Sequence, residues 1–114
     1  MNNESSHGQF MLLLRVTGVN EAKIDTLAKQ IHDDYMEEYG EKGAMTVSLL
    51  KCLGVVGSGT NAANAQQWDY VVRYFGPTDS VAWLQKTLES FASKEPNGGV
   101  LTQTYRASDL TGRY

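Results

Sequence analysis

Apolar residues recur along this chain with two alternating periods, and their order predicts strands and helices in turn. The first apolar run, at residues 9–17, is nearly continuous, which is typical of a central strand buried on both faces. Asn20 then provides an N-cap for a helix that is expected to end near Gly40. Within this helix, apolar side chains at spacings of three and four form one stripe, made of Ile24, Leu27, Ala28, Ile31 and Tyr35.

Two further strands are expected in the middle of the chain. Residues 44–56 are rich in aliphatic and β-branched side chains and predict a second strand with a bend at Gly54. Residues 57–67 have the composition of a long loop. Residues 68–75 alternate aromatic and β-branched side chains and predict the third strand.

The last part of the chain repeats the order of helix and strand. Residues 77–79 begin a second helix, whose apolar stripe comprises Val81, Leu84, Leu88, Phe91 and Ala92. The segment at residues 96–99 ends this helix, and residues 100–107 predict the fourth strand. The resulting β-α-β-β-α-β order predicts an α+β, ferredoxin-like unit: an antiparallel sheet with two helices on one face.

Length and composition are those of one small globular domain. The chain has 114 residues, of which 41% are hydrophobic and 20% charged, enough to bury a core without metals or disulfides. We expect a single ferredoxin-like domain at residues 9–110. A disordered, polar tail is expected at residues 1–8, and a C-terminal tail at residues 111–114.

Charge and cysteine content narrow the classes of partner and compartment. The formal net charge of −3 and the pI of about 5.3 disfavour a nucleic-acid partner, which would require a basic surface. Cys52 is the only cysteine, so no intrachain disulfide can form, and a reducing, cytoplasmic location fits. The first apolar run is too short to span a membrane, so no membrane partner is expected.

Both sides of the predicted central strands are apolar, which is unusual for a sheet covered on one face only. In the first strand Phe10, Leu12, Leu14 and Val16 are suited to face the helices, yet the opposite set also contains Met11 and Leu13. An exposed apolar face of this size usually marks an interface or a ligand groove. A symmetric homodimer is the simplest way to cover it.

In element order and in these two-sided strands, residues 9–107 resemble the dimeric α+β barrel superfamily. The resemblance implies two sheets packed face to face around a cavity, as in antibiotic-biosynthesis monooxygenase-like proteins and accessory proteins of pigment gene clusters. It implies a carrier or accessory protein of secondary-metabolite biosynthesis that binds a hydrophobic, aromatic pigment or polyketide-type intermediate and assists a partner enzyme. The alternative from the same superfamily is a monooxygenase, cyclase or isomerase that needs no cofactor.

Candidate ligand-binding residues come from the strands that would line such a cavity. Arg15 and Arg73 could hold a carboxylate, phenolate or enolate, although each equally fits an ion pair with Asp69 or with a partner subunit. Trp68 and Tyr70 could line a pocket for a flat aromatic molecule together with two further tyrosines. Core packing is the structural alternative for all of these rings.

The candidate catalytic residues are His32, Tyr74 and Tyr105, as proton-transfer groups beside the arginines. His32 borders the apolar stripe of the first helix, where a partly buried surface histidine is the alternative. No metal site is expected, because neighbouring His32 and Asp33 point in different directions around a helix. The glycine-rich segment near residue 57 lacks the GK[ST] ending of a phosphate loop, so no nucleotide cofactor is expected either.

Overall fold

The computed structural model describes residues 7–59 and 68–107. These residues form four strands, three α-helices and two short 3-10 helices. In chain order they are β1 (His7–Thr17), α1 (Glu21–Ile24), α2 (Leu27–Tyr39), η1 (Gly40–Lys42), β2 (Thr46–Lys51), β3 (Tyr70–Pro77), η2 (Thr78–Ser80), α4 (Val81–Ser93) and β4 (Gly99–Arg106).

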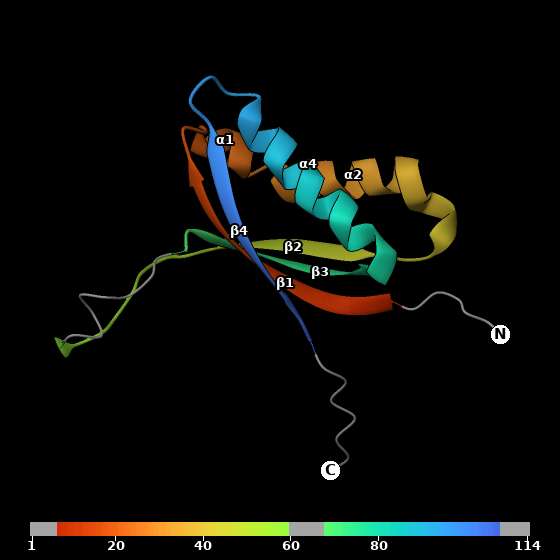
Figure 1. Cartoon of the computed structure of the whole chain (residues 1–114), viewed down its shortest axis with the longest axis horizontal. Coiled ribbons are helices and arrows are strands. Elements are labelled where there is room, and N and C mark those ends of the chain that lie inside the picture. The colour runs from red at the N-terminus through yellow and green to blue at the C-terminus, as the bar shows by residue number, and fades with distance from the viewer. Residues whose placement is uncertain (1–6, 60–67, 108–114) are drawn as a thin grey trace, which may run out of the picture.

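The four strands form one antiparallel sheet in the order β2-β3-β1-β4, so β1 and β3 are central as the sequence predicts for β1. Leu12 at the middle of β1 lies opposite Val72 of β3 on one side and opposite Thr104 of β4 on the other. Helices α1, α2 and α4 all lie on one face of the sheet, and none of these three covers the opposite face (Figure 1). The molecule is therefore a two-layer α+β structure compatible with a ferredoxin-like arrangement.

The core lies between the helices and the sheet, and it confirms the predicted stripes. From β1, Phe10, Leu12 and Leu14 are buried, while Met11 between them is 45% exposed. The buried side chains that meet them from the helices are Ile24, Leu27, Ile31, Tyr35, Leu84, Leu88 and Ala92. Period two in the strand and period 3.6 in the helices thus select the same core.

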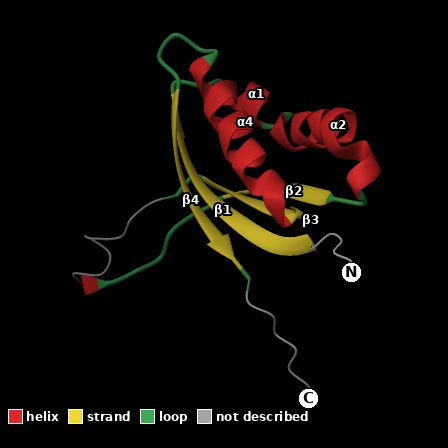
Figure 2. Ribbon diagram, turned by 45° about the vertical axis from the view of Figure 1, so that its right-hand side comes forward, coloured by secondary structure: helices red, strands yellow, loops and turns green. Residues whose placement is uncertain are grey.

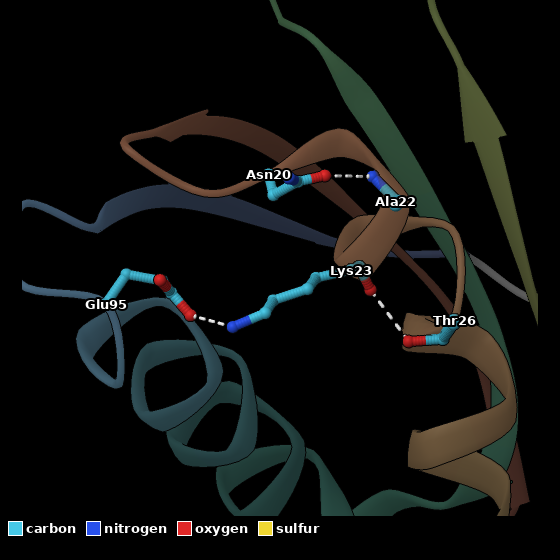
Figure 3. Close-up of polar contacts among 5 residues, drawn as sticks. All are labelled: Asn20, Ala22, Lys23, Thr26 and Glu95. Carbon is cyan, nitrogen blue, oxygen red and sulfur yellow. Dashed lines mark hydrogen bonds and ion pairs between the residues drawn. The ribbon is translucent and has the colours of Figure 1, made fainter.

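The single helix predicted after the first strand is wrong, because the chain forms two helices with a break at Asp25 and Thr26. As predicted, Asn20 caps the first turn: its Oδ1 accepts from the Ala22 N–H at 2.7 Å. The Thr26 hydroxyl donates to the carbonyl of Lys23 at 2.8 Å, a local bond that competes with helix continuation (Figure 3).

An ion pair then joins the short helix α1 to the chain at the end of α4. Lys23 of α1 pairs with Glu95, just beyond the end of α4 (Figure 3). The close approach of β1 and β4 at this end depends on Gly18, which has a φ of 72°. A side-chain carbon there would lie 2.1 Å from the carbonyl oxygen of Asn97, so glycine is required.

Two predicted strand boundaries also need correction. The second strand ends at Lys51 and not at residue 56, because β3 begins at Tyr70 and no described strand lies beside the following residues. The Cys52 N–H still bonds to the Asp69 carbonyl at 2.8 Å, after which residues 52–59 leave the sheet (Figure 1). We call residues 52–59 the projecting arm.

The N-terminal boundary differs as well, since β1 begins at His7 and its first two residues pair with β3. Residues 7 and 8, expected in the disordered tail, are therefore part of the sheet. The remaining predictions for the tails, and most of the predicted loop, concern residues 1–6, 60–67 and 108–114, which lie outside the described residues.

Candidate ligand-binding face

The sheet face opposite the helices is the principal candidate site. Because antiparallel neighbours share a face, the strand register identifies its side chains. We call this set the open face, and it comprises Gln9, Met11, Leu13, Arg15, Thr46, Ser48, Leu50, Val71, Arg73, Phe75, Leu101, Gln103 and Tyr105. Figure 2 shows the curved sheet with α1, α2 and α4 on one side of it.

The open face combines apolar exposure with positive charge. Met11, Leu50, Leu101 and Tyr105 are between 44% and 50% exposed, which is high for large apolar side chains in the middle of strands. None of the open-face residues is an aspartate or glutamate, whereas two are arginines. A ligand on this face would therefore meet apolar and aromatic surface together with the guanidinium of Arg73.

A hollow of about 400 Å³ lies at one end of the open face. Its lining includes Met11, Ser48, Arg73, Phe75 and Tyr105, which come from all four strands. The size is within the range of about 300–1,000 Å³ usual for small-molecule sites. Apolar rings and a thioether beside one guanidinium are suited to a flat molecule with one anionic group.

Arg73 is the charged group of this hollow. The register places it between Ser48 of β2 and Met11 of β1, and its side chain is exposed. Within the described ranges, no carboxylate lies within ion-pair distance of its guanidinium. Arg73 therefore retains its five N–H donors for a ligand or a second subunit.

Arg15 lies on the same face but belongs to a different environment. Its guanidinium carbon is 5.6 Å from the centre of the Trp68 ring, a cation–π contact at the end of the sheet. Because Arg73 lies opposite Met11, four residues before Arg15, the two arginines are about 13 Å apart at about 3.3 Å per residue. They do not form one clamp for a single carboxylate.

Asp69, the alternative partner considered for the arginines, has an identifiable role in the sheet. Its Oδ2 accepts a hydrogen bond from the Val16 N–H at 3.0 Å, and its own N–H donates to the Leu14 carbonyl at 2.7 Å. The side chain thus extends the ladder between β1 and the start of β3 by one bond.

Tyr70 and Tyr74 lie on the helix side of the sheet. Tyr70 is 7% exposed and Tyr74 2%, and both belong to the core. The Tyr74 hydroxyl is 2.5 Å from the Ser80 Oγ, whose proton goes to the Pro77 carbonyl at 2.7 Å. Burial raises the pKa of both phenols, which keeps them protonated and makes them weaker acids than an exposed tyrosine.

Both Tyr74 and Tyr105 border the hollow, but Tyr105 is the candidate tyrosine whose side chain lies on the open face. It lies opposite Met11 on the open face and is 49% exposed. Its hydroxyl accepts a hydrogen bond from Nε2 of Gln103 at 2.6 Å, which leaves the phenolic proton available to a ligand.

His32 lies far from these groups in the fold. It is exposed on α2, in the layer behind the sheet, with its Nδ1 3.5 Å from Oδ1 of Asp33. The structure therefore brings together Arg73 and Tyr105 but does not bring His32 to either. No group of three or more metal-ligating side chains is found in the part of the chain that the structure describes.

Sequence reasoning did not single out Ser48 or Phe75 as site residues, although both line the hollow. For Phe75 the signal was present, since it is two residues from Arg73 in a strand and so shares its face. For Ser48 no local signal exists, because its position beside Arg73 depends on the pairing of β2 with β3.

Comparison with known proteins adds no family to this geometry. No protein-family model matches the chain, and no curated protein matches it in sequence. Of the helices formed by the described residues, none combines the length and the apolar character needed to cross a lipid bilayer.

Proposed function

We propose that this protein is a carrier or accessory protein of a biosynthetic pathway, and that its open face binds a hydrophobic aromatic molecule carrying a negative charge. The observation that supports this most directly is Arg73, exposed in an apolar, aromatic hollow on a face without carboxylates. A guanidinium beside apolar and aromatic side chains favours a carboxylate, phenolate or enolate over a neutral guest.

The complete site in this proposal is a homodimer of ferredoxin-like units, in the manner of a dimeric α+β barrel. Two open faces packed together would enclose the hollow and remove the exposed apolar side chains from water. The same packing would also enclose two Arg73 side chains with no facing carboxylate, so an anionic ligand would offset their repulsion. Pigment or polyketide-type intermediates have the required chemistry, and a cytoplasmic location is part of the proposal.

Binding is favoured over catalysis by the arrangement of the proton-transfer candidates. A cofactor-independent monooxygenase, cyclase or isomerase would require an acid or base within reach of the bound anion. Tyr74 is committed to Ser80 on the helix side, and His32 is on the far layer. Tyr105 remains as a hydrogen-bond donor that would orient the guest.

The proposal is tested with two fluorescent probes of similar shape and different charge. Anilinonaphthalene sulfonate is an aromatic anion, and N-phenylnaphthylamine is its neutral counterpart. In Arg73→Met we expect the anion to bind about 10- to 100-fold more weakly, the equivalent of about 1.5–3 kcal/mol for a charged hydrogen bond, while the neutral probe changes little.

Lys86→Met is the matched control, since it removes an exposed cation from α4 on the other side of the molecule. Anion binding should be unchanged in this variant. An equal loss of both probes in Arg73→Met, or an equal loss of the anion in the control, contradicts the assignment of Arg73. The solution mass of the wild-type protein tests the dimer separately.

A further inference from the structure

The projecting arm exposes large apolar side chains to a greater degree than the other residues that the structure describes. Leu53 is 93% exposed, Val55 57% and Val56 100%. The arm, CLGVVGSG, carries no charged residue, so nothing in it favours solvent exposure over burial. Three aliphatic side chains within four residues, almost free of contact with their own core, indicate a segment that packs against something else.

The arm stands on the side of the sheet where the open face lies. It leaves the end of β2 and extends away from the helix layer, as both general views show (Figures 1 and 2). Its base is fixed by the bond from the Cys52 N–H to the Asp69 carbonyl at 2.8 Å and by the ion pair of Lys51 with Glu21. Any molecule seated on the open face would therefore lie beside this arm.

The same chain carries the apolar surface that the arm could cover. Leu101 of β4, 50% exposed, lies on the open face opposite Arg15. Leu101 lies at the end of the sheet from which the arm departs. Leu14, the neighbour of Arg15 in β1, lies opposite Tyr70 of β3. Tyr70 in turn lies opposite Lys51, the last residue of β2 before the arm. β2 and β4 are the two edge strands, so the arm and Leu101 are on opposite edges of the same end.

In a homodimer, two-fold symmetry would bring the projecting arm of one copy to Leu101 of the other. When two open faces pack around a two-fold axis that runs along the strands, β2 of one copy lies over β4 of the other at the same end of the sheets. The arm of each copy then meets Leu101 of the second copy. This contact is isologous, so it is made twice and covers both arms at once, whereas a different protein bound to the face would supply no such repeated fit.

We propose that the projecting arm clasps a second copy of this chain, with Leu53 and Val56 packed against the β4 edge of that copy's open face near Leu101. The inference rests on the homodimer of the proposed function and adds to it the segment that closes the dimer. Since neither the arm nor the open face carries a carboxylate, the contact buries no negative charge.

Disulfide trapping tests the contact. Cys52 is the only cysteine, so Cys52→Ser gives a thiol-free background. In that background, the double variant Val56→Cys/Leu101→Cys should form covalent dimers on mild oxidation, at least about tenfold faster than Val56→Cys/Met36→Cys. Met36 is a matched control, because it is 50% exposed but lies on α2 in the helix layer. Equal rates in the two variants, no cross-link, or a disulfide within one chain overturns the proposal.

A second measurement separates this inference from the dimer itself. Leu53→Asp/Val56→Asp places two charges on side chains that are exposed in the single chain, so each copy should still fold, as circular dichroism would verify. Sedimentation should show the dimer dissociating at concentrations at least about tenfold higher than for the wild type or for Met36→Asp. A dimer unaffected by the arm variant overturns the arm contact alone, whereas a monomeric wild-type protein overturns both the contact and the proposed dimer.

Discussion

The buried pair of Tyr74 and Ser80 offers a quantitative test of whether Tyr74 serves the fold or a reaction. The two oxygens are 2.5 Å apart, and the Ser80 hydroxyl donates to the Pro77 carbonyl at 2.7 Å. Both residues are at most 2% exposed, so no water replaces a lost partner. Gly76 belongs to the same arrangement, since a side-chain carbon there would lie 2.7 Å from the Tyr74 hydroxyl.

The expected loss in the free energy of unfolding depends on which buried polar groups each variant leaves without a partner. Tyr74→Phe removes one buried hydrogen bond but leaves the Ser80 bond to Pro77, so we expect a loss of about 1 kcal/mol in the free energy of unfolding. Ser80→Ala leaves the buried phenol without a partner and also removes the hydroxyl bond to the Pro77 carbonyl, so we expect a loss of about 2–3 kcal/mol in the free energy of unfolding. The double variant should lose less than the sum of the two, because the phenol no longer needs a partner.

Urea unfolding followed by circular dichroism measures these differences, and the probe titrations described above measure binding in the same variants. We expect Tyr74→Phe to bind the aromatic anion as the wild type does, since its hydroxyl lies on the helix side of the sheet. Strictly additive losses would refute the proposed coupling. Unchanged stability with a large loss of binding would refute the structural role and restore Tyr74 as a site residue.

Three other expectations follow from the same structure. Burial raises the pKa of Tyr70 and Tyr74 above 10.0, so the unfolded chain loses these protons first as the pH rises. The contribution of the two phenols to the free energy of unfolding is therefore complete below pH 10.0 and falls above it, by up to about 1.4 kcal/mol per pH unit for each phenol. Urea midpoints measured across that pH range would test this. His32→Ala should change neither the urea midpoint nor probe binding, and a clear loss of binding would contradict its placement on the outer layer. Asp69→Ala should lower the free energy of unfolding by about 1 kcal/mol, since it removes the acceptor of the Val16 N–H, and an unchanged midpoint would show that water replaces it.

The sequence predicted the elements of this fold from short-range patterns. The nearly continuous apolar run at residues 9–17 identified the strand that lies at the centre of the sheet, and the stripe that includes Ile31 identified the helix face that packs on it. It missed the break at Thr26, because a hydroxyl that bonds to the carbonyl three residues earlier does not alter the hydrophobic pattern.

The sequence predicted only some of the candidate site residues correctly. It did not show which face of each strand packs against the helices. Alternation places Arg73 and Phe75 on one side of β3 and Tyr70 and Tyr74 on the other, but it does not say which side the helices cover. The structure settles this, and the tyrosines become core residues. His32 could not be placed relative to Arg73, since the two belong to different layers.

By itself, then, the sequence determined the four strands, the helical segments between them and the two-sided apolar character of the central strands. Only the tertiary structure decided that Ser48, Arg73 and Tyr105 share one hollow and that the arm after Lys51 leaves the sheet. The physical reason is that hydrophobic periodicity is a local property of the chain, whereas strand register joins residues far apart in sequence and is fixed by the packing of the whole sheet.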